Sequence, residues 1–131
     1  MEIKDEYELN ALNKLLSKIK FNDDLDFYEF KEFVGSPIIA NIFQRLTDEL
    51  IPIYKQNGWI KDTNFNKFLF DDRVGFVIKK RIDELTEQDK NNLLKNNSVD
   101  EYLYTLIKPL EVSQVEFDKL KIYFIESKKR I

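Results

Sequence analysis

The stretch that decides the fold is FVGSPIIANIFQRLTDEL, residues 33–50. Ser36 is a favoured N-cap residue, and Pro37 follows at the first helical position, where its missing N–H removes no hydrogen bond. Apolar side chains then recur at helical spacing over more than a narrow stripe. A helix that is apolar over such a width is usually central in its domain. The members of this stripe are Ile38, Ile39, Ile42, Phe43, Leu46, Leu50, Ile53 and Tyr54.

We therefore predict an all-α fold. Residues 1–131 should form a single compact helical domain, with about six or seven helices around a central helix at residues 36–56. Pro52 is expected to kink or break this helix, because a proline inside a helix removes one backbone hydrogen bond.

Helical periodicity and N-cap patterns predict the remaining elements. Periodic apolar residues predict helices at 5–20, 22–35 and 71–85. Capping patterns that begin at Thr86, Ser98 and Ser113 predict three more. Residues 59–70 fit a loop, a short helix or a short strand.

Composition supports a folded helical domain and excludes several chemistries. The chain is 43% hydrophobic and 14% aromatic, which suffices to fill a core. It has three Gly and three Pro, too few for the many turns of a sandwich or barrel. It has no Cys and no His, so a disulfide, a Cys/His zinc site, a Cys nucleophile and a His base are all excluded. We predict no catalytic residue, no metal, no cofactor and no enzymatic activity.

The start of the chain and its hydropathy suggest a cytoplasmic protein without membrane association. Met1 is followed by charged residues and not by the apolar run of a signal peptide. No stretch approaches the roughly 18 apolar residues of a membrane span.

Two segments carry residues of the types that bind ions or phosphates. DTNFNKFLFDDR, residues 62–73, begins like a calcium loop, but Lys67 replaces the required Gly and Arg73 replaces the bidentate Glu. The helix at 71–85 carries Lys79, Lys80 and Arg81, which could contact phosphates. Acidic residues follow at once, and the net charge of −3 disfavours nucleic acid as the partner.

The acidic stretch FNDDLDFYEFKE, residues 21–32, is the better candidate for a binding surface. Complementary charge steers the encounter with a basic partner, and an exposed Tyr supplies a rigid anchor. The predicted partner-binding residues are Asp23, Asp24, Asp26, Tyr28, Glu29 and Glu32.

The segment GSPIIANIFQRLTDEL, residues 35–50, resembles the Ser-Pro-initiated apolar helix of immunity proteins from bacterial contact-dependent-inhibition (polymorphic toxin) systems. The resemblance implies a bacterial immunity protein or antitoxin, a helical bundle that binds and neutralises a cognate toxin through protein–protein interaction. The toxin would carry a basic surface, as a nuclease does.

Two alternatives stay open beside this toxin inhibitor. One is a small nucleic-acid-binding regulator that uses the helix at 71–85, which would bind in a salt-dependent way. The other is a structural homo-oligomer, in which the Ile-rich stripe of residues 38–54 would face a second copy.

Overall fold

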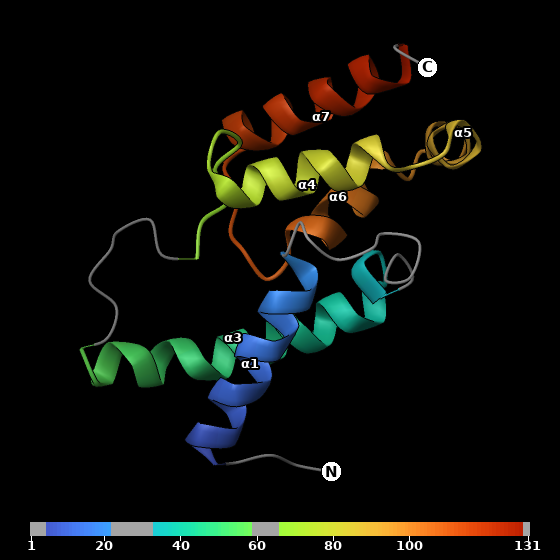
Figure 1. Ribbon diagram of the computed structural model, residues 1–131. Coiled ribbons are helices and arrows are strands. Elements are labelled where there is room, and N and C mark those ends of the chain that lie inside the picture. The colour runs from blue at the N-terminus through green and yellow to red at the C-terminus, as the bar shows by residue number, and fades with distance from the viewer. Residues whose placement is uncertain (1–4, 22–32, 59–65, 130–131) are drawn as a thin grey trace.

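The structure is a computed structural model of the chain, and it describes residues 5–21, 33–58 and 66–129. The helix predicted at 22–35 falls outside these residues except for its last few positions. The described residues form six helices, so the predicted all-α fold is confirmed. Figure 1 shows how these helices are arranged. The helices are α1 (Glu6–Lys20), α3 (Pro37–Gln56), α4 (Arg73–Asp83), α5 (Glu87–Lys95), α6 (Val99–Ile107) and α7 (Gln114–Lys129).

Local interactions at the helix starts explain most of the boundaries. The Asp5 carboxylate accepts hydrogen bonds from the backbone N–H groups of Tyr7 and Glu8 at the start of α1. The Ser36 hydroxyl accepts from Ile39 N at 3.2 Å, with Pro37 in the first turn of α3, as predicted. Such caps satisfy N–H groups that have no partner inside the helix.

The three capping patterns of the last third give two different outcomes. Thr86 accepts from Asp89 N at 3.1 Å, and Ser113 accepts from Glu116 N at 3.3 Å, so both cap their helices as predicted. Ser98 stands at the start of α6 but makes no side-chain cap bond, and its hydroxyl donates to the Asn96 carbonyl instead. The predicted helix start is therefore confirmed there, while the predicted capping interaction is wrong.

Pro52 lies inside α3, which continues to Gln56, so the proline does not end the helix. Pro52 and Asp48, four residues earlier, are both exposed. The Asp48 carbonyl, which Pro52 leaves without an intrahelical donor, is therefore on the side of the helix that faces water.

The buried apolar residues form two clusters rather than one core around α3. The smaller cluster lies between α1 and α3 and contains Leu9, Leu16, Phe43, Leu46 and Leu50. The larger cluster is built mainly by α4, α6 and α7, and its members include Ile78, Leu103, Leu106, Leu120 and Phe124. Phe21 packs against both clusters and joins them.

The position of α3 differs from the predicted central one. Its neighbours are α1, which crosses it, and the end of α6, while α4 and α7 lie side by side in the other half of the molecule (Figure 1). Ile38 is 72% exposed and Ile42 is also exposed, so the first turns of α3 bury only part of the apolar stripe. Among the described residues, the stripe is wide because it includes an outward-facing edge, and not because other elements surround α3 on all sides.

The segment before α4 is fixed by backbone pairing and by a close approach. Phe68 N donates to the Glu111 carbonyl at 2.7 Å, and Glu111 N donates to the Asn66 carbonyl at 2.8 Å. Phe68 is thereby held in the larger cluster. A Cβ at Gly75 would lie 2.1 Å from the Phe70 carbonyl oxygen, so only glycine fits at this point of α4.

Within the described residues, no helix has the length and apolar character required to cross a membrane.

Candidate functional site

The predicted partner-binding residues are not placed by the structure. Asp23, Asp24, Asp26, Tyr28, Glu29 and Glu32 all lie outside the described residues. The acidic surface that they would form stays a prediction.

The stretch that begins like a calcium loop is described only from Asn66 onward. Asn66 takes a left-handed backbone conformation with φ of 65°, and its carbonyl pairs with Glu111 N. In the part of the chain that the structure describes, no three His, Cys, Asp or Glu side chains are grouped to hold a metal ion.

The basic triplet of α4 does not present three cations on one surface. Arg81 is 1% exposed, and its guanidinium lies 3.6 Å from the Glu84 carboxylate. The Lys79 ammonium lies 3.9 Å from the centre of the Phe70 ring, in a cation–π contact. Arg81 is thus part of the packed interior and is not available to a phosphate.

Helix α7 is apolar on two opposite faces. Its inner face carries Phe117, Leu120 and Phe124, which are buried in the larger cluster. Its outer face carries Val115, Ile122 and Ile125, which are 66%, 56% and 39% exposed. An ordinary surface helix has an apolar stripe on one side only, so the outer face of α7 requires a separate explanation.

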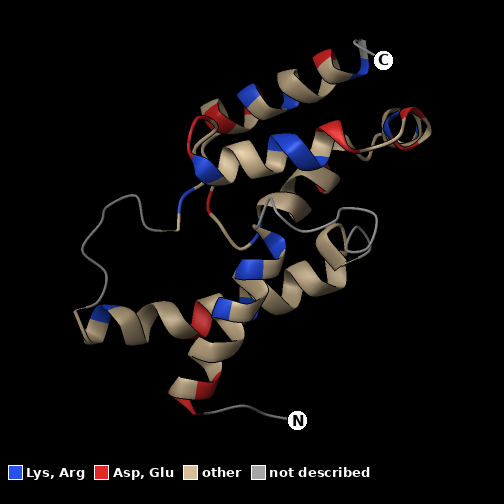
Figure 2. Ribbon diagram, in the orientation of Figure 1, with Lys and Arg blue, Asp and Glu red and all other residues tan. Residues whose placement is uncertain are grey.

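Charges of both signs accompany this outer face, as Figure 2 shows for α7. Asp118 and Glu126 are exposed on α7 among the apolar residues. The ammonium of Lys119 lies 3.4 Å from the Glu116 carboxylate, and that of Lys121 lies 3.0 Å from Asp100. The lysines are thus partly neutralised within the chain.

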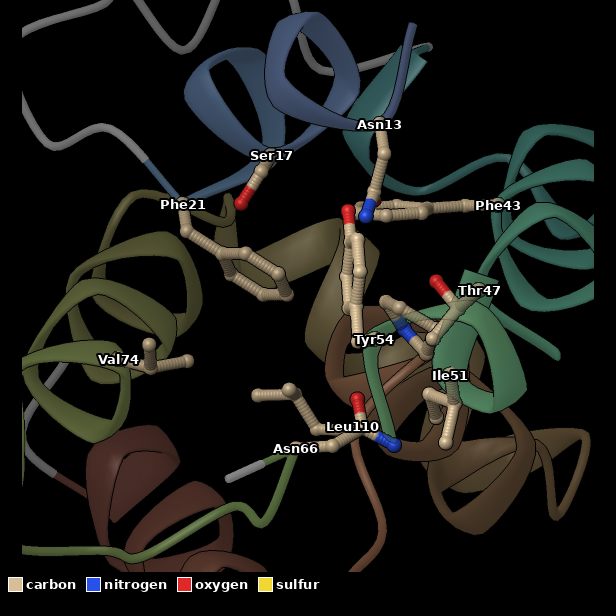
Figure 3. Close-up of a pocket in the computed structure, with 11 residues that line it drawn as sticks. Asn13, Ser17, Phe21, Phe43, Thr47, Ile51, Tyr54, Asn66, Val74 and Leu110 are labelled. Carbon is tan, nitrogen blue, oxygen red and sulfur yellow. The ribbon is translucent and has the colours of Figure 1, made fainter. Parts of the chain in front are cut away.

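A cleft of about 210 Å³ lies where α1 and α3 meet the segment around Leu110 (Figure 3). Phe21 and Tyr54 point into the same space from α1's C-terminal end and from α3. The rings of Phe21 and Phe43 are 6.2 Å apart and tilted by 44°. The Tyr54 hydroxyl donates to Asn10 Oδ1, which fixes the tyrosine ring between the two helices.

Thr47 is the unusual polar residue of this cleft. Its side chain is 5% exposed, and its Oγ1 makes no hydrogen bond with any described residue. A threonine inside a helix commonly bonds back to the carbonyl four residues earlier. A buried hydroxyl without a partner is unfavourable. Thr47 therefore lowers the free energy of unfolding relative to an apolar residue of the same shape at this position.

Lys20 is the most strongly perturbed cation near the cleft. It is 3% exposed, and its ammonium donates to the backbone carbonyls of Thr105 and Lys108. Burial, together with the nearby charge of Lys108, lowers the pKa of Lys20 to about 7.

Burial also raises the pKa of the Tyr102 hydroxyl, and the charge of Asp89 acts in the same direction.

The sequence interpretation missed Thr47 and Lys20, although a signal was present for both. Thr47 falls four residues after Phe43 and three before Leu50, and Lys20 falls four residues after Leu16. Each polar residue therefore lies on the buried face of its helix.

No protein-family model, curated protein or solved structure matches the chain.

Proposed function

We propose that the protein is a protein-binding module, most concretely an immunity protein or antitoxin that binds and neutralises a partner toxin in the cytoplasm without catalysis. The outer face of α7 is the observation that carries this proposal. Val115, Ile122 and Ile125 are exposed there although the inner face of the same helix is already packed. Exposed apolar side chains grouped on one face are typical of protein–protein interaction sites.

The preference for a basic partner rests on the acidic residues that the sequence predicts as a binding surface, among them Asp23, Asp24 and Glu29. A basic surface, such as that of a nuclease toxin, would complement them. Helix α7 carries four lysines against three acidic residues, so its own charge does not select the sign of the partner.

The test begins with affinity capture from the organism that encodes the chain, at physiological salt, with mass spectrometry and an assay for bound nucleic acid. A captured protein is then produced alone to measure its toxicity, and together with this chain to measure rescue. One stoichiometric partner whose toxicity is suppressed supports the proposal.

Matched variants locate the surface. Ile122→Lys places a cation on the outer face of α7 and should abolish capture and rescue. Tyr7→Lys changes an even more exposed residue, on α1, and should leave both unchanged. Both variants should keep the wild-type circular dichroism spectrum and melting temperature.

Three results would contradict the proposal. Binding and rescue that survive Ile122→Lys would remove α7 from the interface. Nucleic acid as the only captured molecule would favour the helix at 71–85 instead. Self-association that Ile122→Lys abolishes, with no other partner, would make the outer face a homo-oligomer interface.

A further inference from the structure

We infer that α1 and α3 form a pH-sensitive unit, which detaches from the part of the molecule built by α4, α6 and α7 while that part stays folded, and that a positive charge on Lys20 favours the detached form. The evidence lies at the junction of the two parts, where α1 and α3 meet α4 and residues 105–110. Open clefts, a buried hydroxyl without a partner and a buried cation all occur there. The outer face of α7 belongs to the part that stays folded, so the two proposals are independent.

Each part has an apolar core of its own. Leu9 and Leu16 of α1 pack with Phe43, Leu46 and Leu50 of α3 in the smaller cluster. The larger cluster is built mainly by α4, α6 and α7. Segments that open as cooperative units often coincide with such local packing units. The α1–α3 pair would therefore keep its internal packing when it leaves the other part.

The apolar connection between the two cores is small. Among the described residues of the α1–α3 part, Phe21 and Val34 are the side chains that pack with the larger cluster. Val34 lies just before α3 and is 2% exposed. The free-energy cost of exposing apolar surface scales with its area. Detachment of the α1–α3 pair should therefore cost less than unfolding of the whole chain.

Packing at the junction is incomplete. The cleft of about 210 Å³ in Figure 3 is lined by Phe21 and Tyr54 from one part and by Val74 and Leu110 from the other. A second cleft, of about 440 Å³, lies between the end of α1 and the start of α4. Atoms that face open space lose dispersion contacts. The buried Thr47 hydroxyl, which has no partner among the described residues, adds to the cost of the closed junction.

Lys20 places a positive charge inside this junction. Its ammonium donates to the carbonyls of Thr105 and Lys108, and it lies 5.8 and 5.9 Å from the centres of the Phe21 and Phe43 rings. The charged side chain that acts on it from the end of α6 is Lys108, which is also positive. Among the described residues, no carboxylate forms an ion pair with Lys20. A buried charge without a counter-charge is costly, although aromatic rings offset part of the cost.

Detachment returns the Lys20 ammonium to water, which sets the direction of the pH effect. In the closed form the pKa of Lys20 is lowered to about 7, whereas an exposed lysine has a pKa of 10.5. The detached form therefore holds the proton more tightly. Its population should rise as the pH falls from about 10 to 7 and should level off below 7. The change is at most about tenfold per pH unit.

The test is native-state hydrogen exchange of the full chain at pH 7.5 and 9.0, read by NMR or mass spectrometry. Each exchange rate is divided by the rate of the unfolded chain at the same pH, which gives an opening constant. Amides of α1 and α3 should share one opening constant that exceeds those of α4, α6 and α7. That constant should be about twentyfold larger at pH 7.5 than at pH 9.0. In Lys20→Met it should not change with pH.

Two matched variants separate detachment from global unfolding. Val34→Ala removes apolar contact across the junction and should raise the opening constant of α1 and α3 about tenfold. Val99→Ala makes the same replacement in the larger cluster, beside Lys121 of α7 and away from the junction. It should raise the opening constants of α4, α6 and α7 and leave that of α1 and α3 unchanged.

One opening constant shared by all the helices would overturn the inference, and so would equal effects of Val34→Ala and Val99→Ala on α1 and α3. An opening constant of α1 and α3 that changes with pH equally in the wild type and in Lys20→Met would overturn the role of Lys20. The comparison of helices in the wild type requires no substitution, so detachment stays testable if a variant fails to fold.

Discussion

The ammonium of Lys20 donates a hydrogen bond of 2.6 Å to the backbone carbonyl of Thr105, 85 positions further along the chain. Lys20 ends α1, and Thr105 lies in the last turns of α6. The C-terminal carbonyls of a helix have no intrahelical donor, so Lys20 supplies one. Lys108 reaches in the opposite direction and donates to Asn41 of α3 at 3.1 Å. These two lysines tie the α1–α3 pair to the larger cluster.

The first prediction concerns pH. Because the pKa of Lys20 is lowered to about 7 in the folded state from 10.5 in the unfolded state, only the unfolded chain holds this proton between those values. The contribution of Lys20 to the free energy of unfolding should therefore rise with pH across that window, by at most about 1.4 kcal/mol per pH unit. Below pH 7 Lys20 is protonated in both the folded and the unfolded chain. The folded state then bears the full free-energy cost of burying the charged ammonium.

Lys20→Met is the control for this pH dependence. Urea unfolding at pH 7.5 and 9.5 should show the wild type gaining about 2–3 kcal/mol relative to the variant. A neutral amine still has N–H groups for the carbonyls of Thr105 and Lys108, so its deprotonation does not break the contact. If the free energy of unfolding changed with pH by the same amount in the wild type and in Lys20→Met, the predicted lowering of the Lys20 pKa would be wrong.

The second prediction concerns Gly75. Its replacement by Ala should lower the free energy of unfolding by about 1–3 kcal/mol or more, because the new methyl group would overlap the Phe70 carbonyl oxygen. Gly58 has a φ of 69° with open space around it, so Gly58→Asn should change stability by less than about 1 kcal/mol. Urea denaturation of both variants tests this, and an equally stable Gly75→Ala would disprove the close approach.

The third prediction separates the two edges of the α3 stripe. Leu46 is buried between α1 and α3, and Leu46→Ala should cost about 2–5 kcal/mol. Ile38 belongs to the same sequence pattern but is mostly exposed, so Ile38→Ala should stay within about 0.5 kcal/mol of the wild type. Thermal unfolding distinguishes the two. Comparable losses would mean that α3 is enclosed on both edges.

The fourth prediction compares two helix starts. Thr86→Ala removes the bond to Asp89 N and should cost about 1 kcal/mol. Ser98→Ala removes only a hydroxyl that donates to the Asn96 carbonyl, so it should cost less. Amide hydrogen exchange in the first turns of α5 and α6 should rise in the first variant and change little in the second. The reverse order would contradict the caps described above.

Much of the helical architecture could be predicted because its signals are local. Ser36 with Pro37, Thr86 and Ser113 each act within about four residues of themselves. Pro52 shows the limit of such rules, because its effect on α3 depends on whether the carbonyl of Asp48 faces water. Ser98 shows a second limit of local rules. Its hydroxyl donates to the nearby Asn96 carbonyl and does not cap the first turn of α6.

The candidate sites were harder to predict. The acidic residues 23–32 stay a prediction, while the outer face of α7 was not identified from the sequence. In the sequence, the outer face of α7 resembles a core face. Hydropathy does not show which of two apolar faces of a helix packs against the rest of the protein and which stays exposed, as Val115, Ile122 and Ile125 do. Thr47 resembles any polar residue on a helix until the neighbouring helix is in place.

The sequence by itself determined the helical class, most helix boundaries and the absence of thiol and imidazole chemistry, because these depend on residue type and on contacts within one or two turns. Only the tertiary structure decided that Arg81 and Lys20 are buried, that Ile38 and Ile122 are exposed, and that a cleft opens beside Thr47. Helical periodicity fixes the direction in which a side chain points. Its burial depends on residues that lie far away in the chain and pack against it.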